Sequence, residues 1–239
     1  MQFECVSRTH VGLKRKINED SVLVAAERGL WAVADGMGGH EAGEIASNMV
    51  ADALRALPAL DDLDQLTLEA GETLRRVNGE LIELARSRPH ERKSTIGTTV
   101  VGLAIANGAF RCFWMGDSRC YRMRGGELAR ISRDHSLVQN LIDAGMLTPE
   151  QAEAHESASV ITRAVGAAED AEIDVVQGDA VPGDLFVLVS DGLTRVVGDD
   201  ELAAELNGAP LDHTADRLIE MVLARGAPDN VSLVIVRPL

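Results

Sequence analysis

Aromatic residues are scarce in this chain, and its cysteines are few and scattered. Phe, Trp and Tyr make up only 3% of the 239 residues, which argues against a surface that stacks nucleic-acid bases. Cys5, Cys112 and Cys120 form no C-x-x-C pair and have no neighbouring His. We therefore expect reduced thiols packed in strands rather than disulfides or zinc ligands.

Positive charge and long hydrophobic runs are also lacking. The chain has 23 Lys and Arg against 38 Asp and Glu, a net charge of −15, which disfavours nucleic-acid and anionic-membrane partners and favours a cationic ligand. No apolar run approaches transmembrane length. The first residues, Met1-Gln2-Phe3-Glu4, lack the basic and apolar regions of a secretion signal. We expect a cytoplasmic protein.

Apolar residues, at 46% of the chain, supply an ample core for one large domain or at most two small ones. Apolar or alternating runs predict strands over residues 4–9, 21–27, 30–34, 98–106, 109–115, 120–124, 127–131, 173–177, 184–190 and 231–236. Spacings of three and four predict helices from 41 to about 58, at 74–85, 137–144, from 148, at 199–206 and at 211–224.

Two dipeptides, Asn107-Gly108 and Gly125-Gly126, predict tight hairpins between consecutive strands. Antiparallel pairing of this kind disfavours a doubly wound parallel sheet. We predict one α+β domain over residues 1–239, whose antiparallel sheets carry helices on their outer faces. The polar segment 136–165 is expected to form a small insertion over the sheet.

Four aspartates lie at the ends of predicted buried strands, each beside a glycine or an asparagine: Asp35, Asp117, Asp191 and Asp229. Each one alone is an ordinary turn former. Together they would leave uncompensated negative charge in one place unless cations neutralise them. Because all the candidate ligands are oxygens, the pattern favours magnesium or manganese over zinc, copper or iron.

Further polar residues precede the second predicted strand and follow the third. Arg15 lies five positions before Asp20 and suits a two-oxygen contact with phosphate, but it also belongs to the exposed run Lys14-Arg15-Lys16. Glu19 and Asp20 add two carboxylates. His40 is either a proton donor to a leaving oxygen or a residue at a helix start.

With these residues in place, the chain resembles the PPM family of metal-dependent protein serine/threonine phosphatases, also called protein phosphatase 2C-like, in its compact bacterial form. Eight motifs carry the resemblance, in family order and over nearly the whole chain. They are Gly12-x-x-Arg15-x-x-Asn18-Glu19-Asp20-Ser21, Asp35-Gly36-Met37-Gly38-Gly39-His40, Ser94-Thr95-Ile96-Gly97-Thr98-Thr99, Gly116-Asp117-Ser118-Arg119, Asp134-His135-Ser136-Leu137, Ile161-Thr162-Arg163-Ala164-Val165-Gly166, Ser190-Asp191-Gly192-Leu193 and Asp229-Asn230-Val231-Ser232.

The resemblance implies a four-layer α-β-β-α sandwich with a binuclear Mg or Mn centre at one end. Asp35 would bridge both ions, the carbonyl of Gly36 would hold one, and Asp191 and Asp229 would hold the other. Asp117, with Asp191, matches a weaker third metal site of bacterial members.

Other roles follow from the same resemblance. Glu19 and Asp20 match an acidic pair that orients metal-bound water, with Asp20 either a direct ligand or one step removed. Arg15 matches the arginine that grips the substrate phosphate. Animal-type members place a general-acid histidine where this chain has Met37; bacterial members share Met37, so His40 is the candidate acid. Residues 136–165 match the mobile flap that is implicated in substrate choice.

The resemblance implies hydrolysis of phosphoserine and phosphothreonine on proteins by a metal-activated water, opposing a Ser/Thr kinase. The alternative is a non-catalytic phosphopeptide-binding module of the same fold, although Asp35, Asp191 and Asp229 are all intact. A hydrolase of small phosphate esters is disfavoured because no phosphate-cradling Gly-rich loop is present. We expect a monomer whose partners are phosphorylated proteins.

Overall fold

The computed structural model describes residues 2–38, 41–58, 60, 62–87 and 95–239. Its strands are β1 (Phe3–His10), β2 (Asp20–Ala25), β3 (Leu30–Met37), β4 (Gly97–Thr98), β5 (Val100–Ala106), β6 (Ala109–Met115), β7 (Arg119–Arg124), β8 (Glu127–Arg130), β9 (Asp174–Asp179), β10 (Leu185–Val189) and β11 (Val231–Pro238). Its helices are the 3-10 turn η1 (Ala26–Arg28), α1 (Ala42–Arg55), α2 (Leu63–Arg86), α3 (Leu137–Asp143), α4 (Pro149–Glu153), α5 (Asp191–Thr194), α6 (Asp199–Glu205) and α7 (Leu211–Ala224).

The strands form two antiparallel sheets. One has the order β1-β11-β10-β7-β8, and the other has the order β2-β3-β5-β6-β9, with β4 paired to β3. The two predicted hairpins join β5 to β6 and β7 to β8. Asn107 and Gly108 have φ of 52° and 75°, the positive values that a tight hairpin turn needs. The predicted antiparallel architecture is confirmed.

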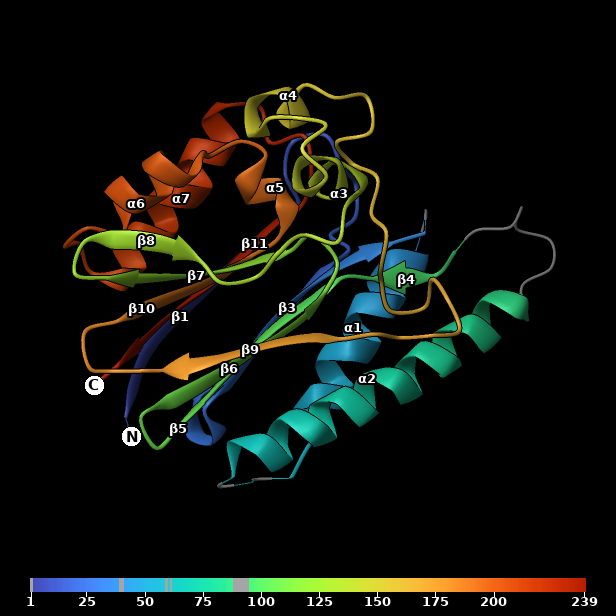
Figure 1. The fold of residues 1–239 in the computed structure, drawn as a ribbon, viewed down its shortest axis with the longest axis horizontal. Coiled ribbons are helices and arrows are strands. Elements are labelled where there is room, and N and C mark those ends of the chain that lie inside the picture. The colour runs from blue at the N-terminus through green and yellow to red at the C-terminus, as the bar shows by residue number, and fades with distance from the viewer. Residues whose placement is uncertain (1, 39–40, 59, 61, 88–94) are drawn as a thin grey trace.

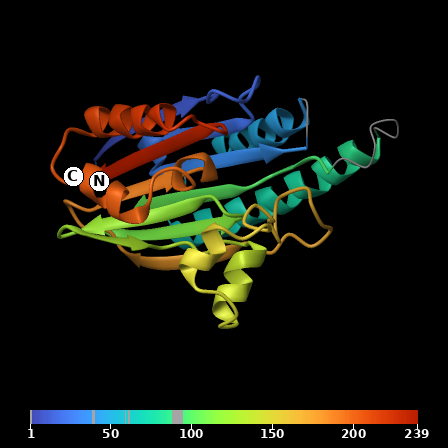
Figure 2. The ribbon, with the colours of Figure 1, turned by 90° about the horizontal axis from the view of Figure 1, so that it is seen from above.

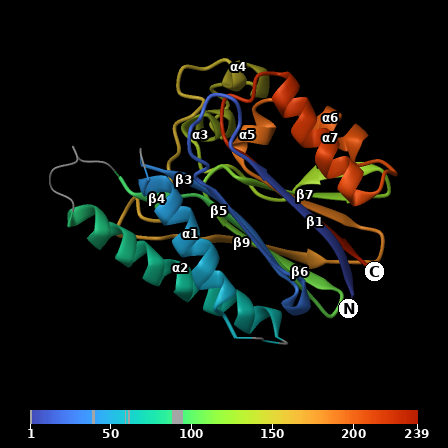
Figure 3. The same cartoon turned by 180° about the vertical axis from the view of Figure 1, so that it is seen from behind.

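Helices cover the outer face of each sheet, so that the molecule has four layers (Figures 1 and 3). Helices α1 and α2 pack on the β2-β3-β5-β6 face, and α5 and α7 pack on the other sheet. Figure 2 shows α3 and α4, in yellow, projecting to one side of the sheets. These two helices lie within the segment that was predicted to be an insertion.

The core has three parts, as a four-layer sandwich requires. One lies between the sheets around Trp31, Leu103 and Phe186, which are fully buried. The others lie under the helices. In α1, the residues Ala46, Val50 and Leu54 recur at four-residue intervals and are fully buried against the sheet, because this spacing keeps them on one helix face. No helix in the described part of the chain has the length and apolar character to cross a membrane.

Three local features differ from the sequence-based expectation. The strand predicted over 98–106 is interrupted at Thr99, whose N–H donates to the Asp35 carbonyl oxygen at 2.8 Å and whose Oγ1 accepts from the Asp35 N–H at 3.2 Å. Helix α5 begins at Asp191, where only a turn was expected. Helix α2 starts at Leu63, well before the marked apolar positions. The first two features lie next to predicted site residues.

Candidate metal centre

The two sheets meet at one end, and this brings together acidic residues that are far apart in the sequence. In one sheet, Asp20 of β2 lies directly opposite Asp35 of β3. From the other sheet, Ser190, which follows β10, donates a 2.9 Å hydrogen bond from Oγ to Oδ2 of Asp20. The carboxyl groups of Asp35 and Asp191 lie close enough for each to shift the pKa of the other. Carboxylates from both sheets therefore share one site.

Burial changes the protonation of these carboxyl groups. Burial raises the pKa of Asp20 to about 7. The nearby charges of Asp191 and Asp229 also raise this pKa, whereas hydrogen bonds from serine hydroxyls lower it. Burial likewise raises the pKa of Asp35 well above its ordinary value, reinforced by Asp20, Asp191 and Asp117. Such crowding favours either a bound proton or a bound cation.

Three buried carboxylate oxygens in this region have no hydrogen-bond partner among the described residues: Glu19 Oε1, Asp20 Oδ1 and Asp117 Oδ1. Unpaired buried polar atoms are costly and call for an explanation such as an ion. Burial also raises the pKa of Glu19. Because oxygen-only donors suit Mg²⁺ and Mn²⁺, the chemistry of these side chains fits a hard divalent ion.

Two glycines let the start of α1 approach β3 closely. A Cβ on Gly36 would lie 2.1 Å from the carbonyl oxygen of Gly43, and a Cβ on Gly43 would lie 2.4 Å from Oε1 of Glu19. Such distances are impossible for a side chain, so both positions need glycine. This packing explains why Gly36 directly follows Asp35, and it places α1 beside the carboxylates.

Arg15 lies at the edge of the site, where its Nη2 donates to Oδ2 of Asp229 at 2.7 Å. Half of the Arg15 side chain is exposed. The loop that carries it is held by Asn230, whose Nδ2 donates to the carbonyl oxygens of Val11 and Ile17 at 2.9 and 3.0 Å. Its Oδ1 accepts from the N–H of Glu19 at 2.8 Å. Asn230 therefore positions both Arg15 and Glu19.

A second arginine stands between the remaining carboxylates. Arg195 lies one helical turn after Asp191, and its Nη2 is 2.7 Å from Oδ2 of Asp191 and 3.7 Å from Oδ2 of Asp117. Burial raises the pKa of Asp117 to about 7, with Asp191 adding to the shift and Arg195 opposing it. Arg195 thus neutralises part of the charge where a third ion was expected.

The structure brings seven of the eight predicted ligand and acid–base side chains to this end of the sandwich: Arg15, Glu19, Asp20, Asp35, Asp117, Asp191 and Asp229. The eighth, His40, lies outside the described residues.

Within the described ranges, no group of three or more His, Cys, Asp or Glu side chains is placed so that it could hold a metal ion. Two of the aspartates, Asp191 and Asp229, pair instead with arginines, so ion binding requires these side chains to turn.

Sequence reasoning gave no role to Asn230, Ser190 or Arg195. Asn230 and Ser190 are buried polar residues beside predicted aspartates, and buried polar groups are normally hydrogen-bonded. Their position next to a candidate ligand was the available signal. For Arg195 the signal was its spacing of four residues from Asp191, which places the two on one helix face once α5 is recognised.

A sequence model of the family described as Protein phosphatase 2C matches residues 11–232 of this chain. The serine/threonine protein phosphatase PstP of Mycobacterium tuberculosis is 37% identical over 229 residues, which are 96% of this chain and 44% of PstP. This chain therefore spans less than half the length of that relative. Protein phosphatase PhpP of Streptococcus pneumoniae is 33% identical, over 95% of this chain and 94% of PhpP.

Solved structures agree with these matches. PppA of Pseudomonas aeruginosa, described as a key regulatory component of T6SS, superposes with a TM-score of 0.92 at 40% identity, covering 100% of this chain and 99% of PppA. The catalytic domain of PstP in complex with two manganese ions superposes with a TM-score of 0.86 at 35% identity, covering 98% of this chain and 97% of that domain.

Proposed function

This chain belongs to the protein phosphatase 2C family, and from that premise we propose that it hydrolyses phosphoserine and phosphothreonine in proteins. The observation that carries the proposal is the meeting of Asp20 and Asp35 from one sheet with Ser190 and Asp191 from the other. The named relatives PstP and PhpP are protein phosphatases, and no observation favours the non-catalytic alternative.

Divalent ions, when bound at such a centre, supply positive charge to the phosphoryl group and lower the pKa of water. We propose that Asp35, the carbonyl of Gly36, Asp191 and Asp229 hold two of these ions. The manganese-bound relative supports two ions, and the choice between Mg²⁺ and Mn²⁺ belongs to the proposal. Asp117, with Asp191, is the proposed third site.

The side chains of this protein then bind the phosphate and orient the water. Arg15, half exposed beside Asp229, turns its guanidinium to two phosphate oxygens. Glu19 and Asp20 accept hydrogen bonds from the attacking water and align it opposite the seryl or threonyl oxygen. As the new P–O bond forms and the old one breaks, the leaving oxygen needs a proton. His40 is the proposed donor, on the resemblance alone.

The cellular setting is also a proposal. We propose that the enzyme opposes a Ser/Thr kinase, acts as a monomer on phosphoproteins and works in the cytoplasm, where its three free thiols would stay reduced. We further propose that residues 1–239 form one domain and that the segment 136–165, with α3 and α4, acts as a flap in substrate choice.

A phosphatase assay on a phosphothreonine peptide tests the proposal. We expect phosphate release that depends on manganese, is lost with a chelator and falls at least about a thousandfold in Asp35→Asn. Exposed Asp170→Asn is the matched control, and it should retain the wild-type rate. Tight binding of the phosphopeptide without phosphate release, in the presence of manganese, would show that the chain is a binding module instead.

A further inference from the structure

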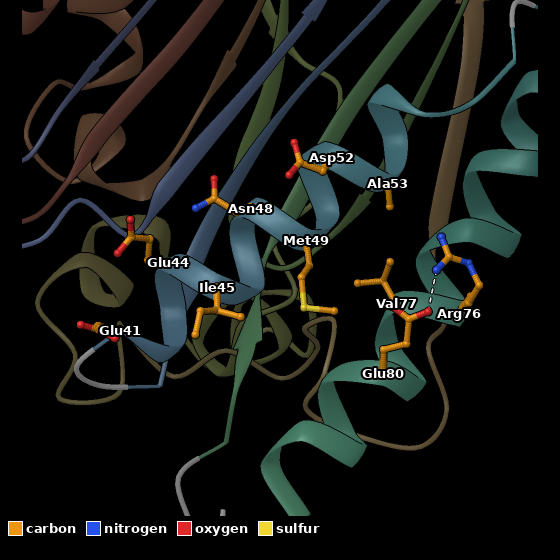
Figure 4. A pocket seen from close by; sticks show the side chains of 10 residues that line it. All are labelled: Glu41, Glu44, Ile45, Asn48, Met49, Asp52, Ala53, Arg76, Val77 and Glu80. Atoms are coloured by element: carbon orange, nitrogen blue, oxygen red, sulfur yellow. Dashed lines mark hydrogen bonds and ion pairs between the residues drawn. The ribbon is translucent and has the colours of Figure 1, made fainter. Parts of the chain in front are cut away.

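A groove of about 620 Å³ runs between α1 and α2, on the outer helical layer (Figure 4). Its apolar floor is formed by Ile45 and Met49 of α1 and by Val77 of α2. Met49 and Val77 lie between the two helices (Figure 4). Ile45 and Met49 are half-buried and Val77 is only 1% exposed, so the first two provide the accessible apolar surface on which another chain can bury a side chain.

The rim of the groove is acidic. Glu41, Glu44, Asp52 and Glu80 contribute four carboxylates, against one guanidinium from Arg76. Arg76 is already paired with Glu80 at 2.6 Å, and Asp52 is paired with Arg55. For Glu41 and Glu44, no ion pair is found within the described part of the chain. The floor is therefore apolar and the rim carries excess negative charge, which complements a segment that is both basic and apolar.

One end of the groove borders the candidate metal centre. Gly43, next to Glu44, packs against Glu19 so closely that a Cβ would lie 2.4 Å from Oε1. One turn further along α1, Asn48 accepts a 2.7 Å hydrogen bond from Ser21, the residue after Asp20. A chain that leaves the centre along α1 therefore enters the groove directly.

The dimensions set the length of the occupant. Glu44 and Asp52 are eight residues apart on α1, a distance of about 12 Å along the helix axis. An extended peptide advances about 3.3 Å per residue, so about four of its residues span the groove. An occupant of this length is a short segment that flanks a phosphorylated residue rather than a whole folded domain.

We propose that the α1–α2 groove docks a basic, amphipathic segment of the phosphoprotein substrate, in which Lys or Arg residues flank one apolar side chain. The proposal rests on the proposed phosphatase function, because it assigns the groove to the same substrate. The acidic rim repels anionic lipid and nucleic acid. In this arrangement Arg15, beside Asp229, binds the phosphate, and the acidic groove selects the sequence next to the phosphorylated residue.

The test uses the manganese-loaded protein and two charge-reversal variants of equal size. Asp52→Lys/Glu80→Lys alters the rim of the groove, where the two side chains are 72% and 47% exposed and each pairs with an arginine. Asp212→Lys/Glu220→Lys is the matched control on α7, where the side chains are 81% and 67% exposed and also pair with arginines. Both variants change the net charge by the same amount.

Binding is measured first, by fluorescence anisotropy, with an unphosphorylated labelled peptide in which Lys and Arg flank a central Leu. We expect the groove variant to weaken binding about tenfold at low salt and the α7 control by less than about twofold. Replacing the central Leu of the peptide with Ser should also weaken its binding to the wild-type protein. Equal binding by both variants, or equal binding of a peptide with Glu in place of Lys and Arg, would overturn the proposal.

Catalysis is then compared on two phosphothreonine peptides, one with basic and one with acidic flanks. We expect the groove variant to lower kcat/KM for the basic peptide about tenfold relative to the acidic one, mainly through KM. A wild type that binds the basic peptide but releases no phosphate would contradict the proposed function and leave docking intact. An unchanged ratio with normal turnover would contradict docking alone.

Sedimentation tests whether a second copy of the chain occupies the groove instead. If the wild type forms a dimer and the groove variant alone does not, the groove is a dimer interface and the docking proposal is wrong.

Discussion

Ser190 and Asp20 join the two sheets: the Ser190 hydroxyl donates to Oδ2 of Asp20 at 2.9 Å and accepts from the N–H of Ser232 at the same distance. All three residues are buried. One hydroxyl thus connects the end of β10, the start of β11 and the start of β2. Asp20 already lies opposite Asp35 through the pairing of β2 with β3, and the bond to Ser190 ties this pair to the other sheet.

Replacing Ser190 with Ala should therefore destabilise the metal-free protein. The change leaves a buried carboxyl and a buried N–H without their partner, at a cost of about 2–4 kcal/mol. Urea unfolding in the presence of a chelator measures the loss of unfolding free energy. Ser87→Ala, at an exposed serine after α2, is the control and should cost less than about 0.5 kcal/mol. A similar small loss for Ser190→Ala would show that the two sheets do not depend on this contact.

The raised pKa of Asp20, about 7, makes the stability of the metal-free protein depend on pH. Between the ordinary value of 3.8 and 7, the folded state binds more protons than the unfolded state. The free energy of unfolding therefore falls as pH rises across this window, by up to about 1.4 kcal/mol per pH unit for this group. The contribution is lost above pH 7.

Unfolding of wild type and Asp20→Asn at pH 5.5 and 8 tests this sign. The wild type should lose more stability at pH 8 than Asp20→Asn does, and manganese should restore it, because a cation replaces the proton. Burial lowers the pKa of His135, and this group alone makes the stability of both proteins fall as the pH drops below 6.5. The wild type and Asp20→Asn are therefore compared with each other at each pH, so that the shared effect of His135 cancels. Parallel curves for the two proteins would contradict a raised pKa at Asp20.

Much of the site was predictable because each candidate ligand follows or precedes a strand that sequence periodicity marks clearly. Asp35 after Leu30–Ala34 and Asp229 before Val231 are examples, and both strands begin where they were predicted, although β3 continues through Asp35 to Met37. The dipeptides Asn107-Gly108 and Gly125-Gly126 located both hairpins, and all four residues have the positive φ that such turns need. The four aspartates at strand ends suggested a shared site, but the role of each one came from the family resemblance, because no local pattern specifies which sheet ends meet.

Other features depend on tertiary contacts that no short window contains. Strand β4 has two residues and exists because Gly97 and Thr98 pair with Met37 and Gly36. Helix α5 has four residues, too few for a periodic signal. Arg195 becomes a neighbour of Asp117 only after α5 forms, so its pairing with that carboxylate followed from no sequence pattern.

Asn230→Ala should lower the affinity for manganese and the stability together. The change removes three hydrogen bonds that fix the loop of Arg15 and Glu19, which should cost about 2–4 kcal/mol in unfolding free energy. Isothermal titration with manganese, done well below the unfolding midpoint, should show binding about tenfold weaker. Asn140→Ala, at an exposed asparagine of α3, is the control. Wild-type manganese affinity in a destabilised Asn230→Ala would confine its role to folding.

Arg195→Ala should make a third divalent ion bind more tightly. In the structure the guanidinium stands 2.7 Å from Asp191 and 3.7 Å from Asp117, so it already supplies the positive charge that an ion would bring to these two carboxylates. Removing the guanidinium makes both carboxylate oxygens of Asp117 available, because Oδ1 has no partner among the described residues.

We expect the affinity for the third manganese to rise about tenfold, as measured by equilibrium dialysis, with the affinities for the first two ions little changed. Arg195→Lys should behave like the wild type, and Arg225→Ala, which removes an exposed arginine paired with Glu201, should leave all affinities unchanged. If Arg195→Ala binds the third ion no more tightly, the guanidinium does not compete for this site, and the charge of Asp117 must be balanced elsewhere.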